Sequence, residues 1–322
     1  MTSTLRVIGK YLDQPILVEK LRKAVPVGLG AAACAFTVGE VAKEKTPGEK
    51  RRTGIQTAFV LGATIGSALA APKIATAITK KKALQPIANT KIIDEFVSEK
   101  TLATNVRGIL EKAKKKVLTP KEILTLTQEL KSKDDKRFLD KLIPPPENVS
   151  SKDIFSEIGW LSIVGAVPVV GGVAGGILAD KVNRDDWRKR LPDKIKEGSY
   201  QYLANIFLCN VGAGVALGIL EKNNIQSRMA RGLGMIAGII LTGVIGGSKI
   251  ANMIGDKFIN PLCGGKRGGE RTPELIDIGL HTDDIATVSL LSGLKWIEPA
   301  LPILYTVSGY RAGIGYRNNK TI

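Results

Sequence analysis

The side chains in this sequence best placed to do chemistry are ionisable residues inside apolar segments. Lys295 and Glu298 stand three residues apart, so both lie on one face if that segment is helical. Charged groups at membrane depth are costly and usually paired, so we expect these residues to form an intramembrane polar pair. The alternative is a partly exposed ion pair at a helix break, since Pro299 and Pro302 interrupt the segment.

Lysines and asparagines in other apolar segments have a simpler interpretation. Lys73 and Lys249 lie near the C-terminal ends of their segments, where a lysine can extend to the lipid headgroups and is favoured by the helix dipole. A pair of anion-contacting groups is the functional alternative. Asn205 and Asn210 are five residues apart. We expect them to form helix–helix hydrogen bonds rather than a substrate site.

Known catalytic and metal-binding patterns are not visible in the sequence. There is no nucleophile elbow, phosphate loop, metalloprotease helix or kinase signature. The glycine-rich basic stretch at 264–269 lacks the spacing of a phosphate loop and is typical of a solvated basic loop. His281 is the single histidine, and Cys34, Cys209 and Cys263 are far apart. We therefore predict no catalytic residue, cofactor or metal site, and a protein that is not an enzyme.

Six apolar blocks must position these residues. A membrane span needs about 20 apolar residues, with a range of about 17–25. The third block contains no charge, the first is short, and the sixth is interrupted by charge and proline. We predict an all-α, polytopic helical membrane protein with about six Gly- and Ala-rich helices, the first of them uncleaved. A soluble protein with a glycine-rich helical core is the alternative. The blocks are 24–41, 54–79, 158–179, 200–220, 232–254 and 285–310.

Small residues recur at four-residue spacing in four of these blocks. Such a ridge lets helix backbones approach closely, which is how helices associate in lipid. In water, each mid-helix glycine would cost about 0.5–1 kcal/mol relative to alanine. We predict that a glycine zipper packs the helices, and the same ridges favour a homo-oligomer. The glycines are Gly62, Gly66, Gly171, Gly175, Gly214, Gly218, Gly234 and Gly238.

The polar stretches divide the chain into segments. The Asp13-Gln14-Pro15 sequence is a helix-start signal, and Thr119 with Glu122 forms a capping box that predicts a helix within a polar insert. The N-terminal amphipathic helix either lies on the membrane or packs on the first span. The predicted segments are an amphipathic helix at 1–23, a hydrophobic helix pair at 24–79, a basic helical extramembrane insert at 80–155, hydrophobic helices three to five at 156–254, a polar loop at 255–284, and a last hydrophobic helix with a basic tail at 285–322.

The second and fifth blocks suggest an internal repeat. They align without gaps at an offset of 176, which places Gly62 on Gly238 and Lys73 on Lys249. If every block crosses the membrane, repeat mates run in opposite directions, and the two halves are inverted repeats. The alternative is a chance likeness between glycine-rich stretches.

The charge balance points to an anionic partner. The formal net charge is +17, from 47 Lys and Arg against 30 Asp and Glu, while aromatic residues make up 5% of the chain. Few aromatics and no nucleic-acid-binding motif argue against nucleic acid, so we expect the partner to be the lipid bilayer with anionic lipids. If all six blocks cross, 28 Lys and Arg lie on the side of the long insert, and 17 of these lie in the insert itself, where the positive-inside rule is weak; we place that insert in the cytoplasm.

Two functional classes fit these observations. One is an integral membrane protein with a structural or membrane-organising role that depends on glycine-mediated helix packing. The other is a transporter or channel with two repeat-related halves. Polar groups should converge at mid-membrane in a transporter, whereas here they lie mainly near the block ends. The sequence therefore favours the structural class.

Overall fold

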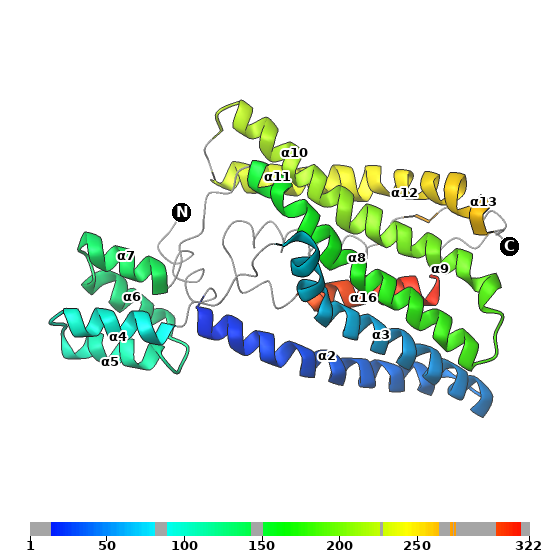
Figure 1. The fold of residues 1–322 in the computed structure, drawn as a ribbon, viewed down its shortest axis with the longest axis horizontal. Helices are drawn as coiled ribbons and strands as arrows, with labels where there is room; N and C mark the ends of the chain where they lie inside the picture. Colours follow the sequence, from blue (N-terminus) through cyan, green and yellow to red (C-terminus); the bar gives the residue numbers. More distant parts are fainter. Residues whose placement is uncertain are drawn as a thin grey trace. The chain divides into compact units, whose positions relative to one another are not determined.

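The computed structural model describes residues 14–80, 89–142, 151–225, 228–263, 271–272, 274 and 301–316. Throughout these ranges the regular structure is helical and contains no strand (Figure 1). The predicted all-α fold class is therefore confirmed. The chain divides into two compact units. Unit 1 is Met1–Val25, Leu84–Asn148 and Ser289–Ala300, and unit 2 is Pro26–Ala83, Val149–Val288 and Leu301–Ile322.

In unit 1, the polar insert folds as four short helices around a core of their own. They are α4 (Asn89–Glu99), α5 (Thr104–Ala113), α6 (Pro120–Glu129) and α7 (Lys133–Leu142). The apolar faces of these helices meet in one cluster, in which the rings of Phe96 and Phe138 stack with centroids 3.7 Å apart. The other buried members are Ile93, Val106, Leu110, Ala113, Leu118, Ile123, Leu126, Leu130, Leu139 and Leu142.

Local polar contacts fix the ends of these helices. The predicted capping box is confirmed, because Thr119 Oγ1 accepts from the Glu122 N–H and the Glu122 carboxylate accepts from the Thr119 N–H at 2.8 Å. Asp135 stabilises the start of α7 in a similar way. Burial acts to raise the pKa of Asp135, but hydrogen bonds from Lys100 and Ser132 outweigh burial and lower that pKa.

Gln14 joins the start of α2 (Pro15–Lys43) to this core. Its side-chain Nε2 donates to the Leu118 carbonyl at 2.8 Å, and the Leu118 N–H donates to Gln14 Oε1 at 2.6 Å. The amide is buried with both its groups satisfied, as a buried polar group requires. The helix begins at Pro15, as the sequence predicts. It continues without a break through residue 23, the predicted end of the amphipathic segment.

Unit 2 contains the long apolar helices. After α2 come α3 (Pro47–Thr79) and α8 (Ser151–Val182). The next helix is continuous through α9 (Trp187–Tyr202), the π-helical η1 (Leu203–Phe207) and α10 (Leu208–Lys222). Another runs through α11 (Arg228–Ile239), η2 (Ile240–Gly247), α12 (Ser248–Ile254), η3 (Gly255–Ile259) and α13 (Asn260–Cys263). The last described helix is α16 (Leu301–Ile314).

Five helices in the described ranges are long and apolar enough to cross a membrane, and they correspond to the first five predicted blocks. They are Ile16–Lys43, Pro47–Thr79, Ile158–Val182, Trp187–Lys222 and Ala230–Ile259. This is the architecture of a polytopic helical protein. The sixth block is described only from residue 301, where α16 has 14 residues, fewer than the roughly 20 of a span. Residues 285–300 lie outside the described residues.

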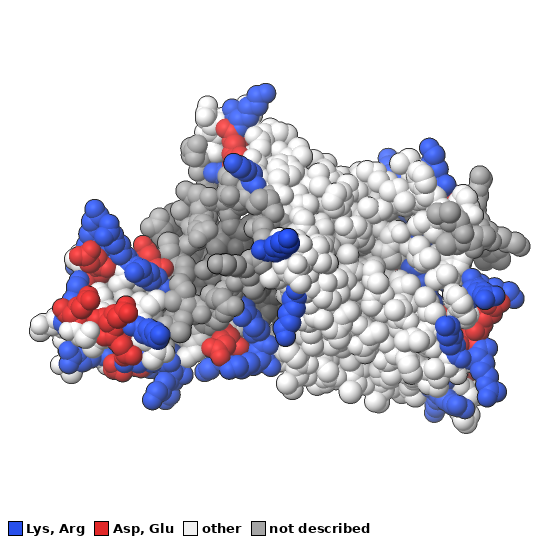
Figure 2. Space-filling model, viewed as in Figure 1, with Lys and Arg blue, Asp and Glu red and all other residues white. Residues whose placement is uncertain are grey.

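The surface of unit 2 suits lipid better than water. Large apolar side chains are exposed along every long helix, for example Val27 (74%), Leu241 (61%) and Val170 (67%). Figure 2 shows a broad uncharged surface over these helices, with charged residues gathered at its margins. A soluble monomer rarely exposes so continuous an apolar surface. In a bilayer, the same side chains are solvated by acyl chains.

The packing also fixes the relative directions of the helices. Along α8, Gly171 meets Ser67 while Gly175 meets Phe59, so α3 runs antiparallel to α8. By contrast, Gly172 meets Gly309 and Gly176 meets Gly313, so α16 runs parallel to α8.

This parallel pair bears on the repeat. Inversion with every block crossing requires the third and sixth blocks to be antiparallel, so the described part of the sixth block departs from the predicted scheme. Lys73 lies one turn before Thr76, whose hydroxyl meets Trp160 near the start of α8. Lys249 lies in α12, which packs on α9. The repeat stays a prediction for the first two pairs of blocks.

Candidate functional site

The structure describes some of the polar residues that lie within the apolar blocks but not others. Lys295 and Glu298 lie outside the described residues, as do His281 and the basic loop at 264–269. Lys73 and Lys249 are described and exposed.

The two predicted asparagines are buried, but the side-chain amides donate to acceptors within their own helix. Asn205 Nδ2 donates to Gln201 Oε1 at 2.9 Å, and Asn210 Nδ2 donates to the Ile206 carbonyl at 2.7 Å. The expected helix–helix hydrogen bonds are therefore replaced by bonds to the preceding turn. A side chain in a helix reaches that turn most easily, because it points back toward the N-terminus.

The predicted glycine ridge is densest on α8, where two adjacent glycine pairs serve two neighbours. A Cβ built on Gly171 would lie 2.9 Å from the Ala63 carbonyl oxygen, and one on Gly175 would lie 2.6 Å from the Phe59 carbonyl oxygen. Both neighbours belong to α3. On the adjacent face, a Cβ on Gly172 would lie 1.8 Å from the Gly309 carbonyl oxygen of α16. Backbone therefore meets backbone on both sides of α8, an approach that only glycine permits.

The other predicted glycines have looser surroundings, with one exception. Gly238 of α11 meets the backbone of Gly212 in α10, at 2.3 Å from a built Cβ to the carbonyl oxygen. Gly214 and Gly234 face the flexible side chains of Phe155 and Leu220, and Gly218 makes an ordinary contact with Ser151. Gly62 and Gly66 have nothing within 4 Å of a built Cβ among the described residues, so they face away from this packing.

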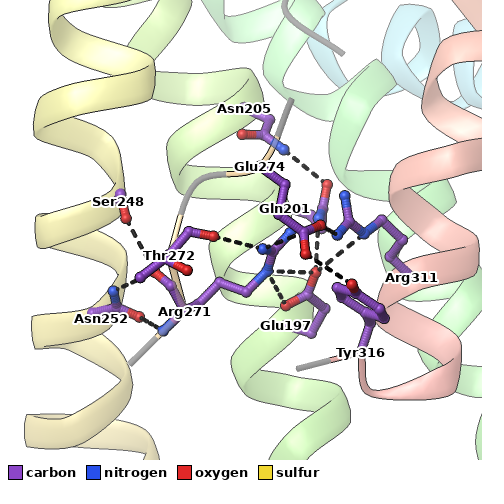
Figure 3. Close-up of polar contacts among 10 residues, drawn as sticks. All are labelled: Glu197, Gln201, Asn205, Ser248, Asn252, Arg271, Thr272, Glu274, Arg311 and Tyr316. Atoms are coloured by element: carbon purple, nitrogen blue, oxygen red, sulfur yellow. Dashed lines mark hydrogen bonds and ion pairs between the residues drawn. The ribbon is translucent and has the colours of Figure 1, made fainter. Parts of the chain in front are cut away.

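A buried charged cluster, which sequence analysis did not find, joins α9, α12, α16 and the segment that follows α13. Figure 3 shows its members converging from these elements. Four charged residues form it, with uncharged side chains around them. We call it the 197–311 cluster: Glu197, Gln201, Asn205, Ser248, Asn252, Arg271, Thr272, Glu274, Arg311 and Tyr316.

Glu197 is at the centre of the cluster and is fully buried. Arg271 Nε donates to its carboxylate at 3.2 Å, and Arg311 Nε lies 3.9 Å from the other oxygen. Gln201, one turn later on α9, donates to Glu197 Oε1 at 2.8 Å. A buried carboxylate is tolerable only with such compensation, because an isolated buried charge costs several kcal/mol.

Arg271 is the largest fully buried side chain of the described residues. Its guanidinium lies close to two aromatic rings, 4.8 Å from the Tyr200 centroid and 5.2 Å from that of Tyr316. Hydrogen bonds with two side chains of α12 also hold the Arg271 backbone. The Arg271 N–H donates to Asn252 Oδ1 at 3.0 Å, Asn252 Nδ2 donates to the Arg271 carbonyl at 2.8 Å, and Ser248 Oγ donates to the same carbonyl.

Glu274 completes the charge balance. Arg311 Nη2 and the Tyr316 hydroxyl both donate to its carboxylate, the hydroxyl at 2.8 Å. Burial acts to raise the pKa of Glu274, but the hydrogen bonds from Tyr316 and Arg311 and the charge of Arg271 outweigh burial and lower that pKa. The hydrogen bond to Glu274 is also the main reason that the pKa of Tyr316 is raised.

The arrangement provides a polar cross-link between helices. Two carboxylates face two guanidinium groups, so the four charges cancel within the cluster. Gln201 and Asn205 extend the polar line along α9 into η1, at i+4 and i+8 from Glu197. The amide side chains of these two residues donate and accept hydrogen bonds but do not titrate, so they do not relay protons by ionisation.

One signal in the sequence could have revealed part of the cluster. Glu197, Gln201 and Asn205 follow one another at four-residue spacing, so they share a helical face that enters an apolar block. The contributions of Arg271 and Arg311 depend on chain segments that only the fold brings together. Cys209 is a buried thiol, Cys34 is exposed, and no group of three His, Cys, Asp or Glu in the described ranges could hold a metal ion.

No protein-family model matches the chain, and the searches of curated proteins and of solved structures found no match either.

Proposed function

We propose that this is a structural, membrane-organising protein, a glycine-packed helical bundle that carries a small helical domain on its polar insert. The observation that supports this proposal most directly is the backbone contact of α8 with both α3 and α16. Contacts of this kind fix helix positions, because any sliding or separation loses close packing along the whole interface. A rigid bundle suits a scaffold.

The 197–311 cluster supports the same proposal. A balanced set of buried ion pairs is more specific in geometry than apolar packing, and it ties the segment at Arg271 to three helices. The separate core of the insert gives the protein a folded domain to display. We further propose that the bilayer and its anionic lipids are the partner and that the insert lies in the cytoplasm.

Reconstitution of the full chain into phosphatidylcholine–phosphatidylglycerol vesicles tests the structural role. A membrane-organising protein should change vesicle size or shape, observed by cryo-electron microscopy, without raising proton or potassium permeability. The control is the same protein with Gly172→Leu, which should lose the effect because α8 and α16 are forced apart. Vesicles of unchanged shape, or an ion flux that depends on the intact protein, would argue against the proposal.

A transporter or channel is the second candidate, and the polar line from Glu197 through Gln201 to Asn205 favours it. This line passes from the polar part of α9 into π-helical η1, and π-helical turns often occur at functional sites. The same vesicles distinguish the two candidates. Transport along this line predicts a flux that Asn205→Leu abolishes while the protein stays folded, whereas the structural role predicts that Asn205→Leu changes no flux.

A further inference from the structure

Cations surround a tryptophan at the turn between α8 and α9. Lys181 Nζ lies 5.2 Å from the centroid of the Trp187 ring, and the Arg188 guanidinium lies 5.6 Å from the same centroid. Both cations are exposed, and Trp187 is half-buried. Near the C-terminal end of α8, the side chains of Leu178 and Val182 are exposed at 49% and 47%. A tryptophan between a charged turn and an apolar helix surface is typical of the membrane–water interface.

Arg184, at the tip of this turn, occupies a backbone position that disfavours it. Its φ is 59°, in the left-handed region. The Arg184 N–H donates to the Lys181 carbonyl, and the Asp185 N–H donates to the Asp180 carbonyl, the bonding pattern of a Schellman cap.

Two other helices end with the same pair of hydrogen bonds, and their residues in the left-handed position are Asn224 and Gly315. Those residue types adopt this conformation readily, whereas arginine is strained in it. The backbone conformation therefore gives no reason for an arginine at position 184, whereas its charge is favoured at a helix C-terminus and leaves an exposed cation at the turn.

Two carboxylates of the α8–α9 turn are already engaged. Asp180 pairs with Lys194 and Arg190, and Asp185 pairs with Arg190 and Arg52. The Arg52 pair, 2.8 Å long, also joins the α2–α3 turn to the α8–α9 turn.

Six exposed lysines and arginines in and beside the two joined turns remain available to a ligand. No described carboxylate forms an ion pair with any of them, and all are exposed. They are Lys45, Lys50 and Arg51 of the first turn and Lys181, Arg184 and Arg188 of the second.

We propose that these joined turns bind the phosphate of an anionic phospholipid, with its acyl chains along Leu178 and Val182. The cations supply the charge, Trp187 sits at the depth of the headgroup, and the apolar face of α8 accepts the chains. Each basic residue near the surface adds about fivefold in affinity for anionic lipid, the equivalent of about 1 kcal/mol. The site rests on the proposed partnership with anionic lipids and names where one of them binds, but it requires neither the structural role nor transport.

Trp187 can report on this site directly. The full chain with Trp160→Phe and Trp296→Phe retains Trp187 as its one tryptophan. In bilayers of unlabelled lipid, brominated phosphatidylglycerol should quench Trp187 fluorescence more strongly than brominated phosphatidylcholine at equal content. Adding Lys181→Gln, Arg184→Gly and Arg188→Gln should reduce that preference at least about fivefold. The matched control removes three cations elsewhere, at Lys73, Lys80 and Lys249, and should leave the preference unchanged.

Arg184→Gly alone separates binding from folding. The glycine relieves the strained cap, so the variant should resist unfolding in detergent as well as the parent or better. Its preference for phosphatidylglycerol should nevertheless fall. Equal quenching by the two lipids in the parent would overturn the proposal. A preference that survives the triple substitution, or that falls as much in the matched control, would overturn it as well.

Discussion

Adding one methyl group between α8 and α16 should measure how much the close backbone contact stabilises the bundle. In Gly172→Ala, the new Cβ would lie 1.8 Å from the Gly309 carbonyl oxygen, about 1.6 Å short of the 3.4 Å at which ordinary contact begins. Rigid backbone lies on both sides, so the helices must separate. Overpacking of this kind costs about 1–3 kcal/mol.

Gly62→Ala is the matched control. The substitution is the same, it also lies mid-helix in a candidate span, and a Cβ there meets nothing within 4 Å. Alanine favours the helix by about 0.5–1 kcal/mol relative to glycine at either position, so this contribution cancels when the two variants are compared. Gly172→Ala should therefore unfold about 1–3 kcal/mol more easily than Gly62→Ala.

The assay is unfolding of the full chain from mild detergent by titration with sodium dodecyl sulfate, followed by circular dichroism. Gly171 and Gly175 replaced together by leucine should lose still more stability, because α3 is forced away as well. If Gly172→Ala and Gly62→Ala unfold within about 0.5 kcal/mol of each other, the usual spread for exposed sites, the close-packing argument is wrong.

Three further predictions concern charged residues. Cysteines placed at Lys73 and Lys249 should react with an impermeant reagent from opposite sides of the membrane, and same-side labelling would contradict inversion of the first two pairs of blocks. Glu197→Gln should lower the free energy of unfolding by about 3–5 kcal/mol, because two buried guanidinium groups then share Glu274 as their one remaining carboxylate; an unfolding curve like that of the parent would refute a stabilising role for the cluster. The lowered pKa of Asp135 means that its contribution to stability is present above about pH 4 and is lost as pH falls through the folded-state pKa. Hydrogen exchange across the insert should therefore show a smaller acid-induced loss of protection in Asp135→Asn than in the parent, and an equal loss would show that Asp135 does not contribute.

Much of the local structure could be predicted from the sequence. The capping box at Thr119 and the start of α2 at Pro15 depend on contacts between residues no more than a few positions apart. The first five apolar blocks became the five candidate spans for a similar reason, because the length and hydrophobicity of a segment are properties of that segment alone. The two adjacent glycine pairs of α8, at 171–172 and 175–176, also indicate that neighbouring helices can approach two of its faces closely.

Which helices approach those faces was decided by the tertiary structure. Nothing local specifies that α16 lies parallel to α8, or that Gly309 and Gly313 meet Gly172 and Gly176. The same holds for the 197–311 cluster. Arg271 lies 74 residues from its partner Glu197, and neither residue type is expected inside an apolar bundle without that partner. Composition and periodicity along one chain therefore determined the kind of helices this protein has, whereas the pairing of its charges and glycines depended on contacts between distant segments, which no single segment encodes.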